Sequence, residues 1–376
     1  MANNNKHTGP NVPALRFPEF SGEWTKIKLG DLGSFFSGGT PSSSRKDFYG
    51  GEIPFIRSGE LHSDSTALSI TKEAYDSCSA KMVNKGDLLL ALYGATSGDI
   101  SISRISGAIN QAILCIRPQY IDAYFIKSLW EKHKKHILET YLQGGQGNLS
   151  SEIIKNISFF FPNSDEQVKI SRLIHIIDDR IETQSKIIEE QETLLRSLRH
   201  KIYSRVQAQS QCTIADVLCY EQPTKYLVTD TDYTDDDSQV PVLTANKAFI
   251  LGYTTENFGI YDKGPCIILD DFTLDCKYVD FKFKVKSSAI KILRAKAKTN
   301  LRFIFEYFRF LELNTTEHRR HYIAEIEPMS ILLPSNEEID RIARLFTALD
   351  ERLEAARKEL KILESQKMYM LQKMFI

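Results

Sequence analysis

Two stretches of the chain share one long pattern of apolar and polar positions. Residues 157–204 and 329–376 each run from an apolar segment through a proline and a short polar turn into a long amphipathic stretch. The two prolines, Pro162 and Pro334, are 172 residues apart, and identical residues recur at this offset throughout both stretches. Two unrelated segments would not keep such a register, so the pattern indicates a tandem duplication.

Within both stretches the apolar residues recur at alternating spacings of four and three, which predicts two long α-helices with heptad seams. Each helix of about 39 residues would be roughly 58 Å long. This length favours a coiled coil over two helices packed into one globular core. The predicted seams are Ile170, Ile174, Ile177, Ile181, Gln184, Ile188, Gln191, Leu195, Leu198 and Ile202 in the first helix, and Ile342, Phe346, Leu349, Leu353, Ala356, Leu360, Leu363, Lys367, Met370 and Met374 in the second.

The polar breaks in the seam differ between the copies, since Gln184 corresponds to Ala356 and Leu195 to Lys367. This difference favours pairing of one helix with the other rather than each with a second copy of itself. Ser164 or Asp165 is the predicted cap of the first helix, and Ser335 or Asn336 that of the second.

The segments ahead of the helices are rich in short β-type runs separated by Gly and Ser clusters, with one amphipathic helix each. The runs predict strands over 52–57, 88–93, 109–117 and 153–162, then 240–243, 266–269 and 278–285, and helices over 122–142 and 301–313. The predicted architecture is therefore two tandem α/β domains separated by two long helices. The expected boundaries are a tail at 1–22, a first domain at 23–165, a first helix at 166–205, a second domain at 206–335 and a second helix at 336–376.

Composition narrows the function classes. The six cysteines include no C-x-x-C pair, which argues against a zinc ribbon or a disulfide framework and favours a reducing cytoplasm. The N-terminus has no apolar signal core and no stretch is apolar enough to span a bilayer, so we expect a cytoplasmic protein without a membrane partner. The net charge of −1 argues against DNA binding by bulk charge, but basic residues concentrate between 277 and 302.

Several strings, in this order along the chain, resemble the DNA-specificity subunits of type I restriction–modification enzymes. They are GEWTKIKLGDLGSFFSGGTPS, IPFIRSGEL, NKGDLLLALYGATSG, GAINQAILCIRP and QGGQGNLSSEIIKNISFFFP, followed by the duplicated helices, so that the resemblance runs from Trp24 to Ile376. The second domain departs from the first, because it carries HRRHYI at 318–323 where the first has GGQGNL. Because of this difference, the resemblance does not predict which residues of the second domain contact DNA, although it does predict the class of the domain.

The resemblance implies a non-catalytic subunit with two target-recognition domains, each reading one half of a bipartite site in double-stranded DNA. It implies that the helices form an antiparallel coiled coil that separates the domains and docks methyltransferase subunits. The expected partners are two modification subunits and two ATP-driven restriction subunits. S-adenosylmethionine, ATP and magnesium would belong to those partners, and no cofactor is expected in this chain.

Residues that can pair with base edges or approach phosphates are the candidates for DNA contact. Asn and Gln bond bidentately to adenine and Arg to guanine, and Gly-rich turns bring backbone N–H groups close to phosphates. In the first domain the candidates are Ser37, Gly38, Gly39, Thr40, Arg57, Ser58, Tyr93, Gln111, Gln143, Gln146 and Asn148. In the second they are Thr244, Asn246, Lys247, Phe272, Arg319, Arg320 and Tyr322, with Lys282, Lys284 and Lys286 expected on one strand face toward phosphates.

Two other classes of function stay open. Asp270, Asp275 and Lys277 could hold a magnesium ion, as in a nuclease, although the wider motif is missing. A two-headed coiled-coil adaptor for proteins would need no DNA contact. Histidine pairs at 133/136 and 318/321 lack a third ligand, so no metal site and no catalytic residue are predicted.

Overall fold

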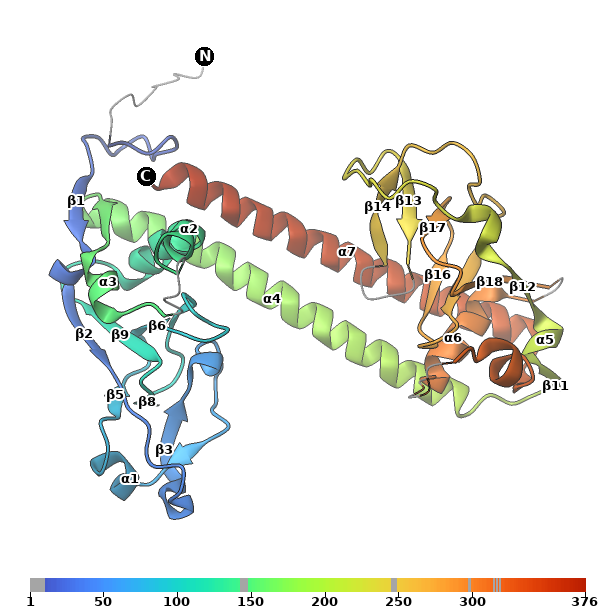
Figure 1. Ribbon diagram of the computed structural model, residues 1–376, viewed down its shortest axis with the longest axis horizontal. Helices are drawn as coiled ribbons and strands as arrows, with labels where there is room; N and C mark the ends of the chain where they lie inside the picture. The colour runs from blue at the N-terminus through green and yellow to red at the C-terminus, as the bar shows by residue number, and fades with distance from the viewer. Residues whose placement is uncertain are drawn as a thin grey trace. The chain divides into compact units, whose positions relative to one another are not determined.

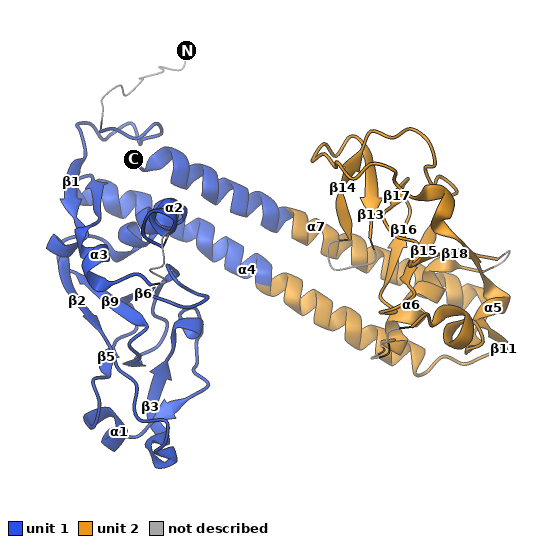
Figure 2. Ribbon diagram, viewed as in Figure 1, with its two compact units in different colours: residues 1–185, 359–376 blue, residues 186–358 orange. Residues whose placement is uncertain are grey.

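The computed structural model describes residues 11–142, 148–244, 249–296, 299–313, 315, 317 and 319–376. The chain divides into two compact units (Figure 2). Unit 1 comprises residues 1–185 and 359–376, and unit 2 comprises residues 186–358. Both units contain part of each long helix, whereas the predicted domains treat the helices as separate segments. The predicted boundaries stay a prediction.

The two long helices are α4 (Ser164–Tyr203) and α7 (Asn336–Met374), seen in Figure 1. In each unit they run antiparallel. In unit 1, Lys367 pairs with Asp178 and Glu359 with Arg180. In unit 2, Arg357 pairs with Glu192, and the Arg199 guanidinium lies over Phe346. Residue numbers thus rise along one helix as they fall along the other, and the predicted pairing of the two helices is confirmed.

All of the predicted seam positions are buried or half-buried in the structure. At the ends of the helices the seam residues join the cores of the two units: Ile170 and Ile174 belong to the core of unit 1, and Ile342 and Phe346 to that of unit 2. The seam therefore serves both a helix pair and two globular cores.

The long helices are capped by residues at equivalent positions of the duplication. The Asn163 side chain accepts a hydrogen bond from the Glu166 backbone N–H, and the Ser335 hydroxyl accepts one from that of Glu338. Ser335 was a predicted cap. The prediction of Ser164 or Asp165 was wrong, because α4 begins at Ser164 and the asparagine before it supplies the acceptor.

Unit 1 has two four-stranded sheets and a two-stranded pair. The first sheet has the order β2 (Gly33–Ser37), β9 (Ile113–Pro118), β6 (Leu88–Ala91), β7 (Ile100–Ile102). The second has the order β4 (Ser69–Ile70), β3 (Tyr49–Ile56), β8 (Gly107–Ile109), β5 (Lys81–Val83), and β1 (Thr25–Lys28) pairs with β10 (Ser158–Phe161). The helices are α1 (Lys72–Asp76), α2 (Ala123–Tyr141), α3 (Ser151–Asn156) and three short 3-10 turns, η1 (Leu29–Asp31), η2 (Lys46–Phe48) and η3 (Ser58–Glu60).

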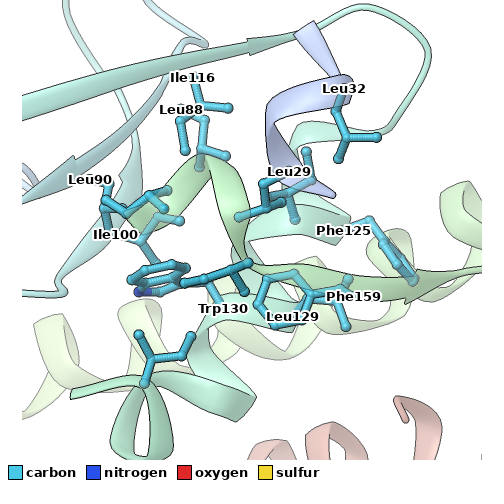
Figure 3. Close-up of a cluster of buried hydrophobic side chains, with 14 of the residues drawn as sticks. Leu29, Leu32, Leu88, Leu90, Ile100, Ile116, Phe125, Leu129, Trp130 and Phe159 are labelled. Carbon is cyan, nitrogen blue, oxygen red and sulfur yellow. The ribbon is translucent and has the colours of Figure 1, made fainter. Parts of the chain in front are cut away.

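Helix α2 packs its apolar face against the first sheet of unit 1. The Asp122 carboxylate caps it by accepting from the Phe125 N–H at 2.8 Å. Trp130 is fully buried and donates its indole N–H to the carbonyl of Gly98 at 2.8 Å. Figure 3 shows this ring beside Leu90 and Ile100 of the sheet. The indole donor therefore anchors the helix to the segment between β6 and β7 without leaving its N–H unpaired.

The N-terminal segment before β1 is attached to α4. The Arg16 guanidinium bonds both carboxylate oxygens of Glu166 at 2.7 Å, and these side chains are 2% and 0% exposed. Arg16 also donates to the carbonyls of Ser21 and Gly22. Part of the predicted tail is therefore packed structure.

Unit 2 repeats the first sheet and the two-stranded pair of unit 1, and its second sheet has three strands rather than four among the described residues. Its four-stranded sheet has the order β12 (Leu218–Glu221), β18 (Ile290–Ala295), β15 (Cys266–Asp270), β16 (Cys276–Val279), which matches the first sheet of unit 1 strand for strand. A second sheet contains β14 (Ile250–Thr254), β13 (Val240–Leu243) and β17 (Lys284–Val285), and β11 (Ser210–Thr213) pairs with β19 (Ser330–Leu333). The helices are α5 (Ile214–Val217), α6 (Leu301–Leu311), the 3-10 turn η4 (Pro223–Tyr226) and the π-helix η5 (Tyr322–Ile326).

The predicted α/β class is confirmed, with corrections to three strands. The run at 153–162 is a strand only from Ser158, because Ser150 caps the short helix α3 before it. The run at 109–117 is interrupted by a turn after Ile109, and that at 278–285 by a break between β16 and β17. None of the described helices is long and apolar enough to cross a membrane.

Candidate nucleic-acid interface

In unit 1 the candidate residues lie where strands end. Ser37 is the last residue of β2, Arg57 follows β3, and Tyr93 lies two residues after β6. Gln111 lies two residues after β8. Strands β2 and β6 both run antiparallel to β9, so these two strands end at the same edge of the first sheet. Strand β3 runs parallel to β8, so these two end at the same edge of the second sheet.

Hydrogen bonds join these strand ends around Gln111. The Thr40 hydroxyl donates to the Gln111 side-chain oxygen. The Gln111 side chain also lies close enough to the Tyr93 hydroxyl to oppose the rise in the pKa of Tyr93 that burial causes. Asn148 pairs with Tyr93 in an isolated β-bridge. The structure thus brings four sequence candidates from four different loops together. Gln143 and Gln146 lie outside the described residues.

Gly38 and Gly39 let the β2 loop reach this cluster. A Cβ atom at Gly38 would collide with the backbone carbonyl of Ile109, and one at Gly39 with Ser79. Larger residues would therefore push Thr40 away from Gln111. The glycines position the loop, which is a role that a Gly-rich string does not reveal in a sequence.

Arg57 is held by a neighbour that was not among the candidates. Glu60 accepts from both the backbone and the guanidinium of Arg57, at 3.1 to 3.2 Å, and these contacts raise the pKa of Arg57. Ser58 begins the short turn η3 between them. The three-residue spacing of an arginine and a glutamate could have indicated this pair. Arg57 is 45% exposed, so its guanidinium is oriented but still reachable.

Unit 2 places its candidates at the equivalent strand ends. Thr244 follows β13, Phe272 lies two residues after β15, and Lys286 follows β17. The parallel pair β13–β17 is closed by the Lys286 N–H bonding the Leu243 carbonyl at 3.0 Å. Thr244 is buried, Phe272 is half-buried and Lys286 is exposed. Asn246 and Lys247 lie outside the described residues.

The segment containing Arg319, Arg320 and Tyr322 is joined to the end of β15. The His321 N–H donates to the Asp271 carbonyl at 3.0 Å, as the Leu149 N–H donates to the Leu92 carbonyl at 2.8 Å in unit 1. Leu149 and His321 are 172 residues apart, so the same connection exists in both copies. His321 of HRRHYI thus occupies the position that Leu149 of GGQGNL has in unit 1.

These three candidates differ in accessibility. Arg320 is exposed, and Arg319 is exposed and paired with Glu317 and Glu325. Tyr322 is 0% exposed and packs edge-on against Tyr220. Its ring belongs to the core of unit 2, so the structure gives Tyr322 no surface with which to contact a base.

Of the three lysines expected on one strand face, Lys284 is buried. Its side chain is 0% exposed, its ammonium lies 2.5 Å from the Glu256 carboxylate, and it donates to the Phe258 carbonyl at 2.8 Å. Strand β17 is only two residues long, so the three lysines do not alternate along one strand. Lys282 is exposed and pairs with Asp262. The structure thus places Lys284 where no phosphate could reach it.

This buried pair predicts a pH dependence. The Lys284 ammonium and the Thr229 hydroxyl hold the pKa of Glu256 down at about 2, below its ordinary value of 4.5. A lowered pKa in the folded state means that the stabilisation is complete above pH 4.5 and is lost as pH falls through about 2. We expect Glu256→Gln to lower the urea midpoint at pH 7, and its difference from the wild type to shrink toward pH 2. A difference that stays constant with pH would contradict the pairing.

The nuclease-like string has its carboxylates engaged elsewhere. Asp270 accepts from the backbone N–H groups of Phe272 and Thr273, and Asp271 from those of His321 and Tyr322. Asp275 is exposed beside Lys277. Across the part of the chain that the structure describes, no three His, Cys, Asp or Glu side chains gather as a metal site.

Comparisons with known proteins find similar sequences among type I specificity subunits. Residues 21–193 match the family described as the type I restriction modification DNA specificity domain. The EcoR124I/EcoR124II specificity subunit of Escherichia coli is 42% identical over 158 residues, covering 38% of this chain and 39% of that protein. The MjaIX specificity subunit of Methanocaldococcus jannaschii is 28% identical over 175 residues, covering 44% and 40%. The matches thus span about two fifths of these relatives.

Other similarities cover nearly the whole chain at lower identity. The putative MjaX specificity subunit of the same archaeon is 22% identical over 95% of this chain and 94% of that protein. The crystal structure of a type I restriction–modification S subunit from M. genitalium superposes with a TM-score of 0.71 at 15% identity, covering 97% of this chain and 99% of that one. That structural likeness shows a shared fold. Residues 21–193 therefore match the family of type I restriction modification DNA specificity domains, and the resemblance of this chain to type I specificity subunits is confirmed.

Proposed function

We propose that this chain is the non-catalytic DNA-reading subunit of a type I restriction–modification complex. Each unit would read one half of a bipartite site in double-stranded DNA. The observation that supports this proposal is that the two units share a fold but differ in their loops. Both bring loops from equivalent strand ends together, with different side chains. Thr40, Tyr93 and Gln111 cluster in unit 1. Lys286 and Arg320 are exposed in unit 2. Two copies of one fold that carry different loop side chains suit two different target sequences.

The long helices would hold the two readers at a fixed spacing. Helix α4 has 40 residues, which at ~1.5 Å per residue gives a rod of about 60 Å. The DNA between the half-sites would then be tolerated as any sequence. Methyl transfer and cleavage would come from modification and restriction subunits docked on the helices. S-adenosylmethionine, ATP and magnesium would be bound by those subunits.

The test of the proposal is co-expression with the modification subunit that is encoded beside this chain. Methylation of a random DNA library is then detected at single-base resolution. We expect methylation confined to a bipartite motif with a fixed unspecified spacer. Exchange of residues 206–335 for those of a relative should change one half of the motif and leave the other intact. Methylation of a continuous site, or a complex that methylates nothing, would contradict the proposal.

A single substitution sharpens this test for unit 1. Gln111→Leu removes the side chain at the centre of the cluster, and we expect it to abolish or relax one half-site only. Gln119→Leu is the matched control, since both glutamines are exposed and lie beyond opposite ends of β9. An equal effect of the two variants would show that the cluster around Gln111 is not the reading site.

A further inference from the structure

A pocket in unit 2 lies between the last turns of α4 and the C-terminal end of α6, away from the strand ends. Its volume is about 390 Å³. Arg196, Arg199 and His200 line it from α4, and Arg309, Phe310 and Glu312 from α6 and its C-cap. The lining therefore carries three arginines and a histidine against one carboxylate. Nothing in the proposed reading of DNA uses this pocket.

Arg199 has a guanidinium nitrogen without a partner. The side chain is 7% exposed, and its Nε donates to Glu306 at 2.8 Å. Its Nη2 atom is buried and has no hydrogen-bond partner among the described residues. An unpaired buried donor on a charged group is costly, so this atom favours the entry of an acceptor into the pocket.

The charges behind the pocket leave an excess of positive charge. Glu306 is fully buried and is shared by Arg199, Arg302 and Arg309, at 2.8, 2.7 and 3.7 Å. Asp350 pairs with Arg302 and, at 3.5 Å, with Arg309. Three arginines thus share two carboxylates, and the exposed Arg196 adds a further positive group at the pocket. Glu312 offsets one of these charges.

The arginines that α4 contributes to the pocket have no counterparts in the other copy of the duplication. The residues 172 positions after Arg196 and Arg199 are Met368 and Leu371. Unit 1 therefore builds the same helix junction without arginines at these positions. Their presence in unit 2 is not a requirement of the fold.

From this geometry we propose that the pocket binds the phosphate group of a small phosphate monoester. Guanidinium groups match phosphate oxygens in planar, bidentate geometry, and a dianion suits the excess of positive charge. A rotation of the Arg199 side chain brings its unpartnered Nη2 to the phosphate, and Arg196 and Arg309 close around it. The volume is within the usual range for small-molecule sites. The proposal does not depend on the DNA-reading function.

Calorimetric titration of the full-length chain at constant ionic strength tests the site. The probes are inorganic phosphate, AMP and adenosine. We expect saturable binding of phosphate and AMP and none of adenosine. Arg196→Gln and Arg309→Gln should each weaken AMP binding about 10-fold, as the loss of one charge-assisted hydrogen bond implies. Arg344→Gln is the control, because Arg344 is exposed on α7 of the same unit and does not line the pocket.

The two variants differ in their risk to folding. Arg309 contacts Glu306 and Asp350, whereas Arg196 is exposed, so Arg196→Gln tests binding with the fold intact. No saturable binding of phosphate, equal weakening by Arg344→Gln, or adenosine binding as tightly as AMP would overturn the proposal. Displacement of AMP by a short DNA duplex at lower concentration than by phosphate would also overturn it, because the pocket would then be a DNA-backbone contact.

Discussion

Replacing Asp178 by alanine should lower the free energy of unfolding of unit 1 by about 3 kcal/mol. Asp178 lies on α4 beneath α2 and α7 and is 19% exposed. Lys127 of α2 contacts it at 2.8 Å, Lys367 of α7 at 2.7 Å, and the Tyr124 hydroxyl donates to it. Without the carboxylate, two enclosed ammonium groups share Glu131 alone. An uncompensated buried charge costs far more than an exposed pair contributes.

The two tryptophans of the chain make this effect measurable in unit 1 alone. Trp24 and Trp130 both belong to the core of unit 1, so urea unfolding followed by tryptophan fluorescence reports on that unit. Asp179→Ala is the matched control, because Asp179 is the next residue along α4, is 64% exposed and pairs only with an exposed histidine, His175, at 3.4 Å among the described residues. The control should change stability by less than about 0.5 kcal/mol. Equal midpoints for the two variants would refute the role of the cluster.

Replacing Asp271 by alanine should have a comparable effect in unit 2 and should also free a candidate recognition loop. Asp271 and Lys291 are 3% and 2% exposed and lie 3.5 Å apart. The same carboxylate accepts from the N–H groups of His321 and Tyr322, at 3.1 and 2.8 Å. Its loss leaves a buried ammonium and the Tyr322 N–H unpaired, whereas the His321 N–H keeps the backbone carbonyl of residue 271. We expect a cost of about 3–5 kcal/mol.

Hydrogen exchange measured by mass spectrometry locates this second effect. Residues 319–326 should exchange faster in Asp271→Ala, because both hydrogen bonds to the Asp271 carboxylate are lost and only the bond from the His321 N–H to the backbone carbonyl of residue 271 remains. Asp275→Ala is the control, since Asp275 is 47% exposed and pairs with the exposed Lys277. In the methylation assay, Asp271→Ala should impair one half-site and leave the other readable. Unchanged exchange in residues 319–326 would show that Asp271 does not hold this loop.

The candidate site could be predicted in part because residue types that pair with base edges or approach phosphates are visible in a sequence. This criterion identified Thr40, Arg57, Tyr93 and Gln111, and the structure gathers three of these at one point. Partners could not be predicted in the same way. The contact between Thr40 and Gln111 joins residues 71 positions apart, and nothing local in either segment indicates it.

Burial was the least predictable property. Lys284 and Tyr322 have side chains that suit nucleic-acid contact, yet both are 0% exposed. Lys284 is enclosed because Glu256, from a loop after another strand, neutralises it, and Tyr322 because η5 turns its ring into the core. Burial depends on what packs over a side chain, and that is a property of the tertiary structure.

The sequence by itself determined the duplication, the two long helices with their seams, and the α/β class of the segments before them. These features follow from periodicity and local hydrogen bonding, which are encoded within a few residues of each position. Only the tertiary structure decided which buried charges are paired, where loops meet and how the arginines of α4 and α6 enclose a pocket. Those outcomes depend on contacts between distant segments, and a local pattern carries no record of them.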